Sequence, residues 1–334
     1  MENTSLEDVY ESVNKDATTI FVVPLIRYDH QKTDYLYLLY KDLIDSGKYD
    51  IKSISVFNHF KLLTGILTQK NAILHYHWLE FQDLKSIFGM PWKILCIYLF
   101  RLFGGNIVWT LHNEFPHDQK NLRLHSFLHK KMAAWSDALH VHCSYAAEIM
   151  KDRLDVSKAK FHLIPHPEFP AENKSKKEAR DFLKNKYELF FTESDRIALM
   201  FGNISYYKQI QEVAEIFINT DIEAYLLVVG PVKKGSQNLF TTLEELQLQH
   251  NNIKMVPDFI EEDEVPFFYC AADLCVFNYR EILSSGGYHM AKAYHKKIVA
   301  PDMGCLSEKG SESNVQLFKT QQELAVLLKS HLNS

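Results

Sequence analysis

The sequence predicts an α/β fold made of two doubly wound, Rossmann-like domains that face each other across a cleft. The first observation is that short apolar segments alternate with helical stretches along the whole chain. Strands that are apolar throughout belong to parallel sheets covered by helices on both faces. The second observation is length, because 334 residues, 46% of them hydrophobic, suffice for two domains with separate cores.

Eleven apolar segments are the expected strands. Six lie in the first half, at 20–25, 51–56, 72–76, 107–111, 138–142 and 161–164, and five in the second, at 197–201, 224–229, 253–256, 274–277 and 298–300. Between the halves, three prolines precede a highly charged stretch. We therefore expect a polar N-terminal tail (1–18), a first domain (19–165), a linker with a charged helix (166–195), a second domain (196–315) and a C-terminal helix (316–334).

Composition and charge exclude several functional classes. The net charge of −5 and the isoelectric point near 6.3 argue against nucleic-acid binding, which needs a basic surface. Five cysteines without C-x-x-C spacing predict neither a disulfide framework nor a zinc site. The N-terminal tail contains no apolar signal segment, and no apolar run reaches the roughly 18 residues of a membrane-spanning helix. We therefore expect a soluble cytoplasmic protein.

Residues 201–208, Phe-Gly-Asn-Ile-Ser-Tyr-Tyr-Lys, follow the first strand of the second half and precede a helix. Gly202 and Asn203 lie in the turn between the two. The unpaired N–H groups and the dipole of a helix N-terminus attract anions, and the Lys208 ammonium adds a charge suited to phosphate. Taken alone, an ordinary surface lysine after a turn is the simpler interpretation.

A second strand, loop and helix of this kind follow the apolar segment 274–277. Ser284 or Ser285 can cap the helix, while Gly286 and Gly287 let the backbone approach a ligand closely. A plain capped turn would explain these residues by themselves. Two anion-binding elements at strand ends of the same half fit the diphosphate of a nucleotide.

Polar residues also gather at strand ends of the first half. His77 and His112 end two predicted strands, followed by Asn113, His117 and the acidic residues Glu80, Glu114 and Asp118. A histidine at a strand end is often structural. Because titratable residues are dense here, a site facing the cleft is about as well supported as a structural role. The spacing of His112 and His117 fits no helical metal pair, so we expect no metal site.

The order and spacing of several segments resemble the donor half of bacterial GT-B glycosyltransferases, most closely family four in its capsule and exopolysaccharide branch. These segments are residues 201–208, Val228-Val-Gly230, Pro257-Asp-Phe-Ile260, Ala271-Ala-Asp273, and Ser285-Gly286 with Ala300-Pro-Asp-Met-Gly304. In the first half, Trp109-Thr-Leu-His-Asn113 is similar to the Thr-x-His-Asn of that branch, and residues 33–40 are similar to its Asn-Pro-Tyr-x-x-Leu-Leu-Tyr. The resemblance covers roughly residues 20–310.

The resemblance implies a hexosyltransferase that moves a sugar from a nucleoside diphosphate sugar to a hydroxyl of a glycan acceptor, with retention of configuration and without a metal or cofactor. The second domain would bind the donor, and the first would be the acceptor side, with His77, Asn113 and His117. His112 and Glu281 would be catalytic. The donor-binding residues would be Gly202, Asn203, Lys208, Arg280, Ser284, Ser285, Gly286 and Gly287.

Two departures from the family pattern leave alternatives open. Asn203 and Ser205 stand where the family usually has an arginine, and Met290 stands where it usually has a glutamate that contacts the nucleotide ribose. One alternative is therefore a degenerate sugar-nucleotide-binding partner subunit without its own activity. The other is a sugar-nucleotide epimerase of the same two-domain type.

The stretch 87–103 is apolar on more than one helical face, with Lys93 and Arg101 inside it and Lys85 just before it. A core helix of the first domain would explain this composition. The alternative is a patch that rests on the inner leaflet of a membrane, with its cations near anionic head groups. Such peripheral membrane binding would suit a polyprenyl-linked acceptor.

Overall fold

A computed structural model of the chain describes residues 3–79, 84–114 and 122–333, with residues 84–88 described in their backbone only. The chain divides into two compact units, Met1–Pro167 (unit 1) and Glu168–Ser334 (unit 2). Each unit contains one six-stranded sheet, and the paired strands of both sheets are parallel. The predicted α/β fold class with two parallel sheets is confirmed.

The sheet of unit 1 has the strand order β2-β1-β3-β4-β5-β6. Its strands are β1 (Thr19–Val23), β2 (Asp50–Ser53), β3 (Ala72–His77), β4 (Asn106–Thr110), β5 (Ala138–Val141) and β6 (Phe161–Leu163). Its helices are α1 (Leu6–Val13), α2 (Tyr35–Ser46), α3 (Phe60–Thr68), α4 (Leu84–Leu102), α5 (Leu122–Trp135), α6 (Ser144–Leu154) and the 3-10 helix η1 (Lys158–Lys160).

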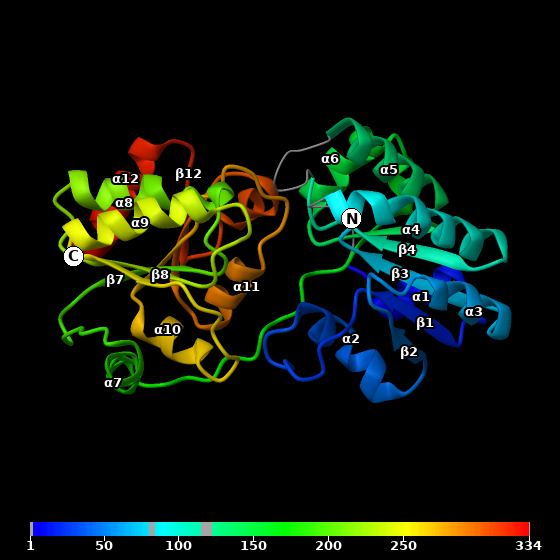
Figure 1. Cartoon of the computed structure of the whole chain (residues 1–334), viewed down its shortest axis with the longest axis horizontal. Helices are drawn as coiled ribbons and strands as arrows, with labels where there is room; N and C mark the ends of the chain where they lie inside the picture. The colour runs from blue at the N-terminus through cyan, green and yellow to red at the C-terminus, as the bar shows by residue number, and fades with distance from the viewer. Residues whose placement is uncertain (1–2, 80–83, 115–121, 334) are drawn as a thin grey trace. The chain divides into compact units, whose positions relative to one another are not determined.

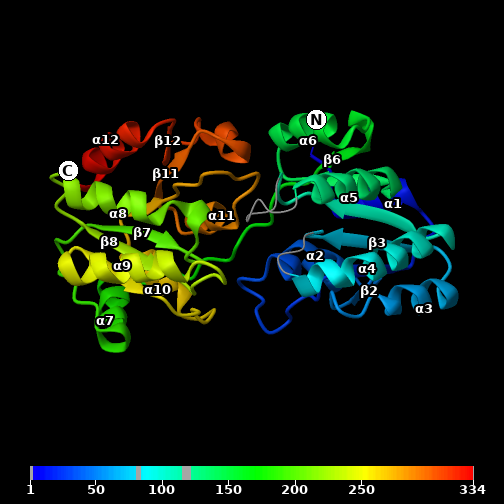
Figure 2. The same cartoon turned by 45° about the horizontal axis from the view of Figure 1, so that its top comes forward.

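Helices cover both faces of this sheet. On one face, Tyr10 of α1 and Tyr40 of α2 share a core cluster with Ile20 of β1. On the other face, the ring of Phe21 lies 6.1 Å from the ring of Phe100 on α4. In Figure 2, α3 lies beside α4, the helix that it contacts most extensively. Because neighbouring strands are parallel, their carboxyl ends meet at one edge of the sheet.

The sheet of unit 2 has the order β12-β11-β10-β7-β8-β9. Its strands are β7 (Ile197–Phe201), β8 (Tyr225–Val229), β9 (Ile253–Val256), β10 (Leu274–Val276), β11 (Lys297–Pro301) and β12 (Val315–Phe318). Its helices are α7 (Lys176–Tyr187), α8 (Ile210–Asn219), α9 (Gln237–Gln249), α10 (Val265–Ala271), α11 (Gly286–Ala293) and α12 (Gln321–Leu332), with 3-10 helices η2 (Tyr206–Lys208) and η3 (Gly304–Lys309).

Unit 2 has the three-layer arrangement of a doubly wound domain. In Figure 1, α8, α9 and α12 lie on one face of the sheet, and α10 and α11 lie on the other. The core between the sheet and the first three helices includes Met200, Val213, Leu243 and Leu324, all at most 4% exposed. The first strand of the unit, β7, lies beside β10, so the strand order reverses between them.

The sequence predicts β1–β11 but misses β12. A C-terminal helix is expected from residue 316, whereas β12 occupies Val315–Phe318 and α12 begins only at Gln321. The strand is short and lies at the sheet edge, where Gln316 is exposed between the buried ends of the strand. Its four residues therefore show too little alternation to indicate a strand.

The prediction of a polar tail at 1–18 is wrong, because α1 lies within it. Ser5 and Asp8 form a capping box at the start of this helix. Leu6, Val9 and Tyr10 are buried on one side of it. These three apolar residues at helical spacing anchor α1 to unit 1, although most of the surrounding residues are polar.

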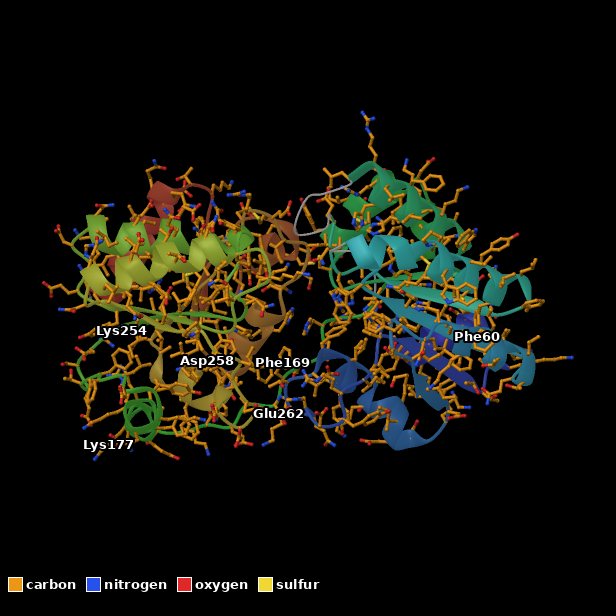
Figure 3. All side chains as sticks on the ribbon, in the orientation of Figure 1. Phe60, Phe169, Lys177, Lys254, Asp258 and Glu262 are labelled. Atoms are coloured by element: carbon orange, nitrogen blue, oxygen red, sulfur yellow. The ribbon has the colours of Figure 1, made fainter. Side chains whose placement is uncertain are left out.

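The charged helix expected in the linker, α7, packs against α10 and belongs to unit 2. Lys177 lies on its exposed side (Figure 3), whereas Arg180 is only 4% exposed. Asp273 forms ion pairs with Lys176 (2.6 Å), Arg180 (3.4 Å) and Arg196 (3.3 Å). One carboxylate therefore joins the helix to the start of β7 and β10.

Helix α4 contains most of the predicted apolar stretch 87–103. Cys96, Ile97 and Phe100 are fully buried, so the interpretation as a core helix holds for one face. Other apolar side chains of the same helix are 43–61% exposed, namely Trp92, Leu95, Tyr98 and Leu102. Among the residues that the structure describes, no helix is long and apolar enough to cross a membrane.

Candidate functional site

The strongest candidate site lies in unit 2, beyond the carboxyl ends of β7 and β10. Doubly wound sheets bind ligands where their strand order reverses, and here it reverses between these two strands. The loops 202–209 and 277–285 leave the sheet at this point, and both contain predicted site residues. A small cavity of about 10 Å³ at their base is lined by residues that include Phe201, Lys208, Phe277, Asn278 and Tyr279.

Two glycines set how closely the strand ends approach each other. Gly202 follows β7 with φ +97°, and Gly230 follows β8 with φ +130°, both in a region that favours glycine. A Cβ atom on Gly230 would lie 2.7 Å from the carbonyl oxygen of Gly202. A Cβ atom on Gly202 would lie 2.9 Å from Nζ of Lys208. Larger residues at these positions would push the loops apart.

Lys208 is buried at this edge and points back towards the strand. Its side chain is 8% exposed, and its Nζ donates to the carbonyl oxygen of Phe201 at 3.0 Å. Burial, and secondly the positive charge of Lys233, lower the pKa of Lys208 to about 7. The lysine lies on η2, and α8 begins after Gln209, which has φ +46° and makes no side-chain cap. An anion at this edge would favour the protonated lysine.

Lys233 is a second cation at this edge, and sequence reasoning missed it. Its backbone N–H donates to the carbonyl oxygen of Ile204 at 2.9 Å. Its Nζ lies 5.7 Å from the centre of the Tyr207 ring, within the range of a cation–π interaction. The available signal was the lysine pair that begins at Lys233, three residues after the glycine that ends β8.

Ser285 is the N-cap of α11. Its Oγ accepts a hydrogen bond from the backbone N–H of Tyr288 (3.2 Å) and also contacts the hydroxyl of Tyr279 (2.8 Å). A Cβ atom on Gly287, in the first turn, would lie 3.1 Å from the ring of Phe277. Of the two predicted capping serines, the structure therefore uses the second. The first turn of α11 follows the loop that leaves β10.

The two predicted anion-binding elements lie together and are joined by backbone and ring contacts. The N–H of Arg280 donates to the carbonyl oxygen of Tyr207 at 2.8 Å. The rings of Tyr207 and Tyr279 stack with centres 5.8 Å apart and planes 8° apart. The Asn278 side chain donates to the carbonyl oxygen of Gln209 at 3.2 Å. The loops therefore form one connected structure.

The remaining predicted donor-side residues belong to the same two loops but differ in exposure. Met290, where the resembling family usually has a glutamate, is buried on α11 and is 8% exposed. Three of the predicted residues are exposed, namely Asn203, Arg280 and Gly286. Glu281 and Ser284 are half-buried.

In unit 1, His77 and His112 lie in contact at the carboxyl edge of the sheet. His77 ends β3 and is 1% exposed, and His112 follows β4 by two residues and is half-buried. Nδ1 of His77 and Nε2 of His112 share a hydrogen bond of 3.1 Å. The ring of Trp78 stacks on His112 with centres 4.0 Å apart. His112 is therefore held on one side by a hydrogen bond and on one face by an aromatic ring.

These two histidines belong to a larger group that we call the histidine network. Tyr40 contacts Nε2 of His77 at 2.9 Å, and Tyr10 contacts Nδ1 of His75 at 2.6 Å. The rings of His75 and His77 stack with centres 4.4 Å apart. The network comprises His75, His77, His112, His140, His142, Tyr10, Tyr35, Tyr40 and Thr110.

Burial keeps the imidazoles of this network neutral. It lowers the pKa of His142 to about 4 and, with the charge of His142 as a second cause, the pKa of His75 to about 3. Burial is also the largest cause that holds the pKa of His77, His112 and His140 well below the ordinary value. Near neutral pH, each ring therefore carries one proton and acts as both a donor and an acceptor.

The sequence indicates part of this network. A further pattern would have indicated more of it: His140 and His142 are spaced as His75 and His77 are. Alternate residues of a strand lie on one face of the sheet, so each pair is expected on a single face. Asn113 is half-buried beside His112.

His117, Glu80 and Asp118 lie outside the described residues. Among the residues that are described, no three His, Cys, Asp or Glu side chains are arranged to hold a metal ion.

Comparison with known proteins gives structural matches only. No known family profile matches the chain, and a search of curated proteins finds no match. Alr3699/HepE of Anabaena, in complex with UDP and glucose, has a TM-score of 0.67 at 12% identity, covering 94% of this chain and 89% of that chain. Sucrose-phosphate synthase of Thermosynechococcus elongatus has a TM-score of 0.67 at 14% identity, covering 95% and 92%.

A glycosyltransferase of Rickettsia africae also matches, with a TM-score of 0.61 at 14% identity, covering 95% of this chain and 89% of that chain. Identities this low carry information about architecture alone. The structural neighbours are GT-B glycosyltransferases, and both sheets of this chain are parallel and doubly wound as that architecture requires. The chain has the GT-B fold.

Proposed function

We propose that this protein is a glycosyltransferase that moves a sugar from a nucleoside diphosphate sugar to a hydroxyl of a glycan acceptor. The observation that carries the proposal is the connected pair of loops where the second sheet reverses its strand order. The neighbour Alr3699/HepE binds UDP and UDP-glucose, which supports the same ligand class for this fold. The sequence segments described above support placement in the capsule and exopolysaccharide branch of family four.

The donor diphosphate would lie at the carboxyl edge of unit 2. Negative charge develops on this leaving group during transfer, and fixed cations and oriented N–H groups stabilise it. Lys208, Lys233 and the first turn of α11 after Ser285 supply these groups. Lys208 would exchange its bond to the Phe201 carbonyl for one to a phosphate oxygen.

In unit 1, His112 would contact the reacting sugar or the incoming hydroxyl. Its imidazole is neutral, so it serves as a hydrogen-bond partner and not as a cation. Glu281, at the carboxyl edge of unit 2, is the carboxylate proposed to stabilise the oxocarbenium-like centre. Transfer with retention leaves the departing phosphate available to accept the proton of the attacking hydroxyl.

We further propose that transfer needs no divalent metal. Two lysines and the helix N-terminus already provide positive charge where the diphosphate leaves. Turnover should therefore persist in EDTA, and the product should keep the anomeric configuration of the donor when it is followed by NMR. Activity that is lost in EDTA and restored by manganese would contradict this part of the proposal.

A sugar-nucleotide-binding subunit without activity is the second candidate function. The observation that favours it is Met290, whose buried thioether cannot accept hydrogen bonds from ribose hydroxyls as a carboxylate would. The donor would then bind through its diphosphate, with no transfer step. Both an inactive binding subunit and an enzyme would therefore have the nucleotide-sugar site, and only the enzyme would show turnover.

The acceptor is proposed to be lipid-linked because α4 presents an apolar surface. Trp92, Leu95 and Tyr98 are exposed on the side opposite its buried residues. Arg101, which would face lipid head groups if this helix rested on a membrane, instead pairs with both carboxylate oxygens of Asp137. Membrane contact would therefore depend mainly on the aromatic and aliphatic side chains.

Sedimentation with vesicles that contain anionic lipid tests this surface. Leu95→Asp should weaken binding, whereas Leu248→Asp, at an equally apolar residue of α9 that is 84% exposed, should leave it unchanged. Equal sedimentation of wild type and Leu95→Asp would remove the membrane from the proposal. The donor-binding proposal would be unaffected by that result.

The decisive experiment for the function is a panel of nucleotide sugars incubated with the full chain. Active glycosyltransferases slowly hydrolyse their donor, whereas a binding subunit does not. We expect one nucleotide sugar to be hydrolysed and to bind in calorimetry. Binding without hydrolysis or transfer would favour the inactive subunit. The absence of both binding and hydrolysis for every nucleotide sugar in the panel would overturn the proposal.

A further inference from the structure

Trp78 is a bulky residue in a backbone conformation that favours glycine. It follows β3 directly and has φ +47°. A tryptophan in this left-handed region is an outlier, and strained residues of this kind gather at functional sites. Asp155 and Glu188 also have positive φ, but they are the C-caps of α6 and α7, where helices commonly end in this conformation. Trp78 follows a strand, so no helix end accounts for it.

Packing of the core does not account for the tryptophan either. Its neighbours in the chain, His77 and Leu79, are 1% and 3% exposed, whereas Trp78 is 38% exposed. The carbonyl oxygen of Leu79 accepts a hydrogen bond from Nε2 of His129 at 2.9 Å, so the chain returns to the core immediately after Trp78. The strained residue therefore holds its indole at the carboxyl edge of the sheet.

Aromatic contacts hold this indole in one place. His112 covers one of its faces, with ring centres 4.0 Å and planes 12° apart. The ring of Tyr35 is nearly perpendicular to it, with centres 5.6 Å and planes 74° apart. The Tyr35 hydroxyl contacts Nε2 of His142 at 2.9 Å, which joins this ring to the histidine network. The indole is therefore fixed against the network, while a large part of the residue stays exposed.

The surroundings of the exposed indole are those that a sugar requires. His112, against the ring, and the next residue, Asn113, are half-buried and carry hydrogen-bonding groups. A pyranose ring has C–H groups on its faces and hydroxyls along its edge. Its C–H hydrogens carry partial positive charge and pack well on the electron-rich face of an aromatic ring. A lipid surface would require apolar neighbours, and imidazoles do not provide them.

We propose that Trp78 is a sugar-binding residue, which packs the apolar face of a pyranose ring of the acceptor against its indole, with hydroxyls of that sugar bonding to His112. Because the ring is already fixed, little side-chain freedom is lost when the sugar binds. That the sugar belongs to the acceptor rests on the proposed glycosyl transfer, whereas sugar binding at Trp78 does not.

Fluorine NMR of the full chain labelled with 5-fluorotryptophan tests this binding. The chain has four tryptophans, and the signal of Trp78 is assigned from the spectrum of Trp78→Phe. The probes are the methyl glycosides of glucose, galactose, mannose and N-acetylglucosamine. We expect at least one of them to shift the Trp78 signal saturably. Glycerol, which has hydroxyls but no ring, should not shift it.

Trp92 is the matched control within the same spectrum, because it is 48% exposed but lies on α4 among apolar side chains. Its signal should not respond to the glycosides. A Trp78 signal that responds to none of the four glycosides would overturn the inference. Equal shifts of Trp78 and Trp92 would overturn it as well, because they would show that any exposed tryptophan responds.

Trp78→Leu keeps apolar bulk and removes the aromatic ring. In saturation-transfer NMR, its affinity for the responding glycoside should fall about tenfold, the upper range for an aromatic contact. Trp92→Leu should leave that affinity unchanged. In an active enzyme, Trp78→Leu should raise the acceptor KM about tenfold at unchanged donor KM. Unchanged glycoside affinity in folded Trp78→Leu would overturn the inference, and if this variant does not fold, the fluorine titration of the wild type decides.

The titration also separates this inference from the proposed function. A protein without transfer activity that binds a glycoside at Trp78 would refute the glycosyltransferase proposal and support the sugar-binding residue. An active enzyme whose Trp78 signal responds to no glycoside would do the reverse.

Discussion

The carboxyl edges of the two sheets are built from different chemistry. In unit 1, neutral histidines and tyrosine hydroxyls bond mainly to one another. In unit 2, glycines, hydroxyls and two lysines lie in the loops that follow the strands. An edge of neutral hydrogen-bond donors and acceptors suits hydroxyl groups, and an edge with cations and N–H groups suits an anion.

This difference teaches that two sheets of the same doubly wound architecture can require opposite protonation states, neutral histidines in one and a protonated lysine in the other. Burial disfavours the charged form of histidine and lysine alike. In unit 1 the acceptor nitrogens must stay without a proton to preserve the network. In unit 2 a bound anion would instead favour the protonated Lys208.

The largest expected effect is destabilisation of unit 1 in acid. The folded-state pKa of His142 is about 4, below the ordinary value of 6.5. Between these pH values the unfolded state binds more protons, so the free energy of unfolding falls as pH falls. The shift of His142 alone corresponds to about 3 kcal/mol. Urea unfolding at pH 7 and pH 4.5 measures the change.

Tryptophan fluorescence reports this unfolding selectively, because all four tryptophans, Trp78, Trp92, Trp109 and Trp135, lie in unit 1. His142→Gln should make the pH dependence weaker. His250→Gln, at the end of α9 in unit 2, should not change it. Equal unfolding free energies for unit 1 at the two pH values would show that the network does not depend on neutral histidines.

The second effect is on turnover. His112→Ala should lower turnover ten- to a thousandfold, or about 1.4 to 4 kcal/mol, while nucleotide affinity remains nearly constant. His129→Ala is the control, since His129 is buried and bonds to the carbonyl oxygen of Leu79 but lies outside the network. It should lower the melting temperature with turnover preserved. Wild-type turnover in folded His112→Ala would show that His112 has a structural role and does not act in transfer.

The third effect is on nucleotide binding at the edge of unit 2. Lys208→Met removes the charge and fills the space, so donor affinity should weaken by about 1.5–3 kcal/mol, the range for a hydrogen bond to a charged group. Stability should not fall, because a buried ammonium is costly. Lys234→Ala, at an exposed neighbouring position, is the control. Unchanged affinity in calorimetry would refute the assignment of Lys208.

Proton uptake sharpens the same test. With a pKa of about 7, Lys208 is largely unprotonated at pH 8, and an anion would raise that pKa. Calorimetry at pH 8 in two buffers of different ionisation enthalpy should show that wild type takes up close to one proton on binding nucleotide. Lys208→Met should take up less.

The smallest effect concerns the cap of α11. Ser285→Ala removes the bond to the N–H of Tyr288 and the contact with Tyr279, and should cost about 1 kcal/mol of stability. Donor affinity should fall slightly with it. Ser284→Ala, at the preceding residue, should have little effect on the melting temperature. Equal melting temperatures for the two variants would show that the cap does not hold the loop.

Much of the fold can be predicted from the sequence because buried parallel strands are apolar throughout. Segments such as Ile197–Phe201 and Ile253–Val256 are strands over the predicted residues. Helix α1 was missed because its three buried residues lie in a polar stretch. Edge strand β12 was missed because it is half exposed. Both depend on partners that are distant in the sequence.

The candidate site could be predicted only in part for the same reason. Lys208 and Ser285 were found from local order along the chain, since each follows a strand and a small residue. The inward direction of Lys208, the proximity of Lys233 and the partners of His77 depend on strand order, which one sequence does not reveal. Residues far apart in the chain, such as Tyr10 and His75, become partners only when the sheet forms.

The contact between Gly230 and Gly202 has a consequence for how this protein can change over generations. Because a single added carbon at Gly230 would strike the neighbouring backbone at 2.7 Å, no second substitution in a side chain can relieve the clash. A saturation library scored for folded protein should therefore show Gly230 as nearly invariant, while exposed Asn203 accepts many replacements. The carboxyl edge of unit 2 can vary in its polar groups but not in the spacing of the two strands that carry them.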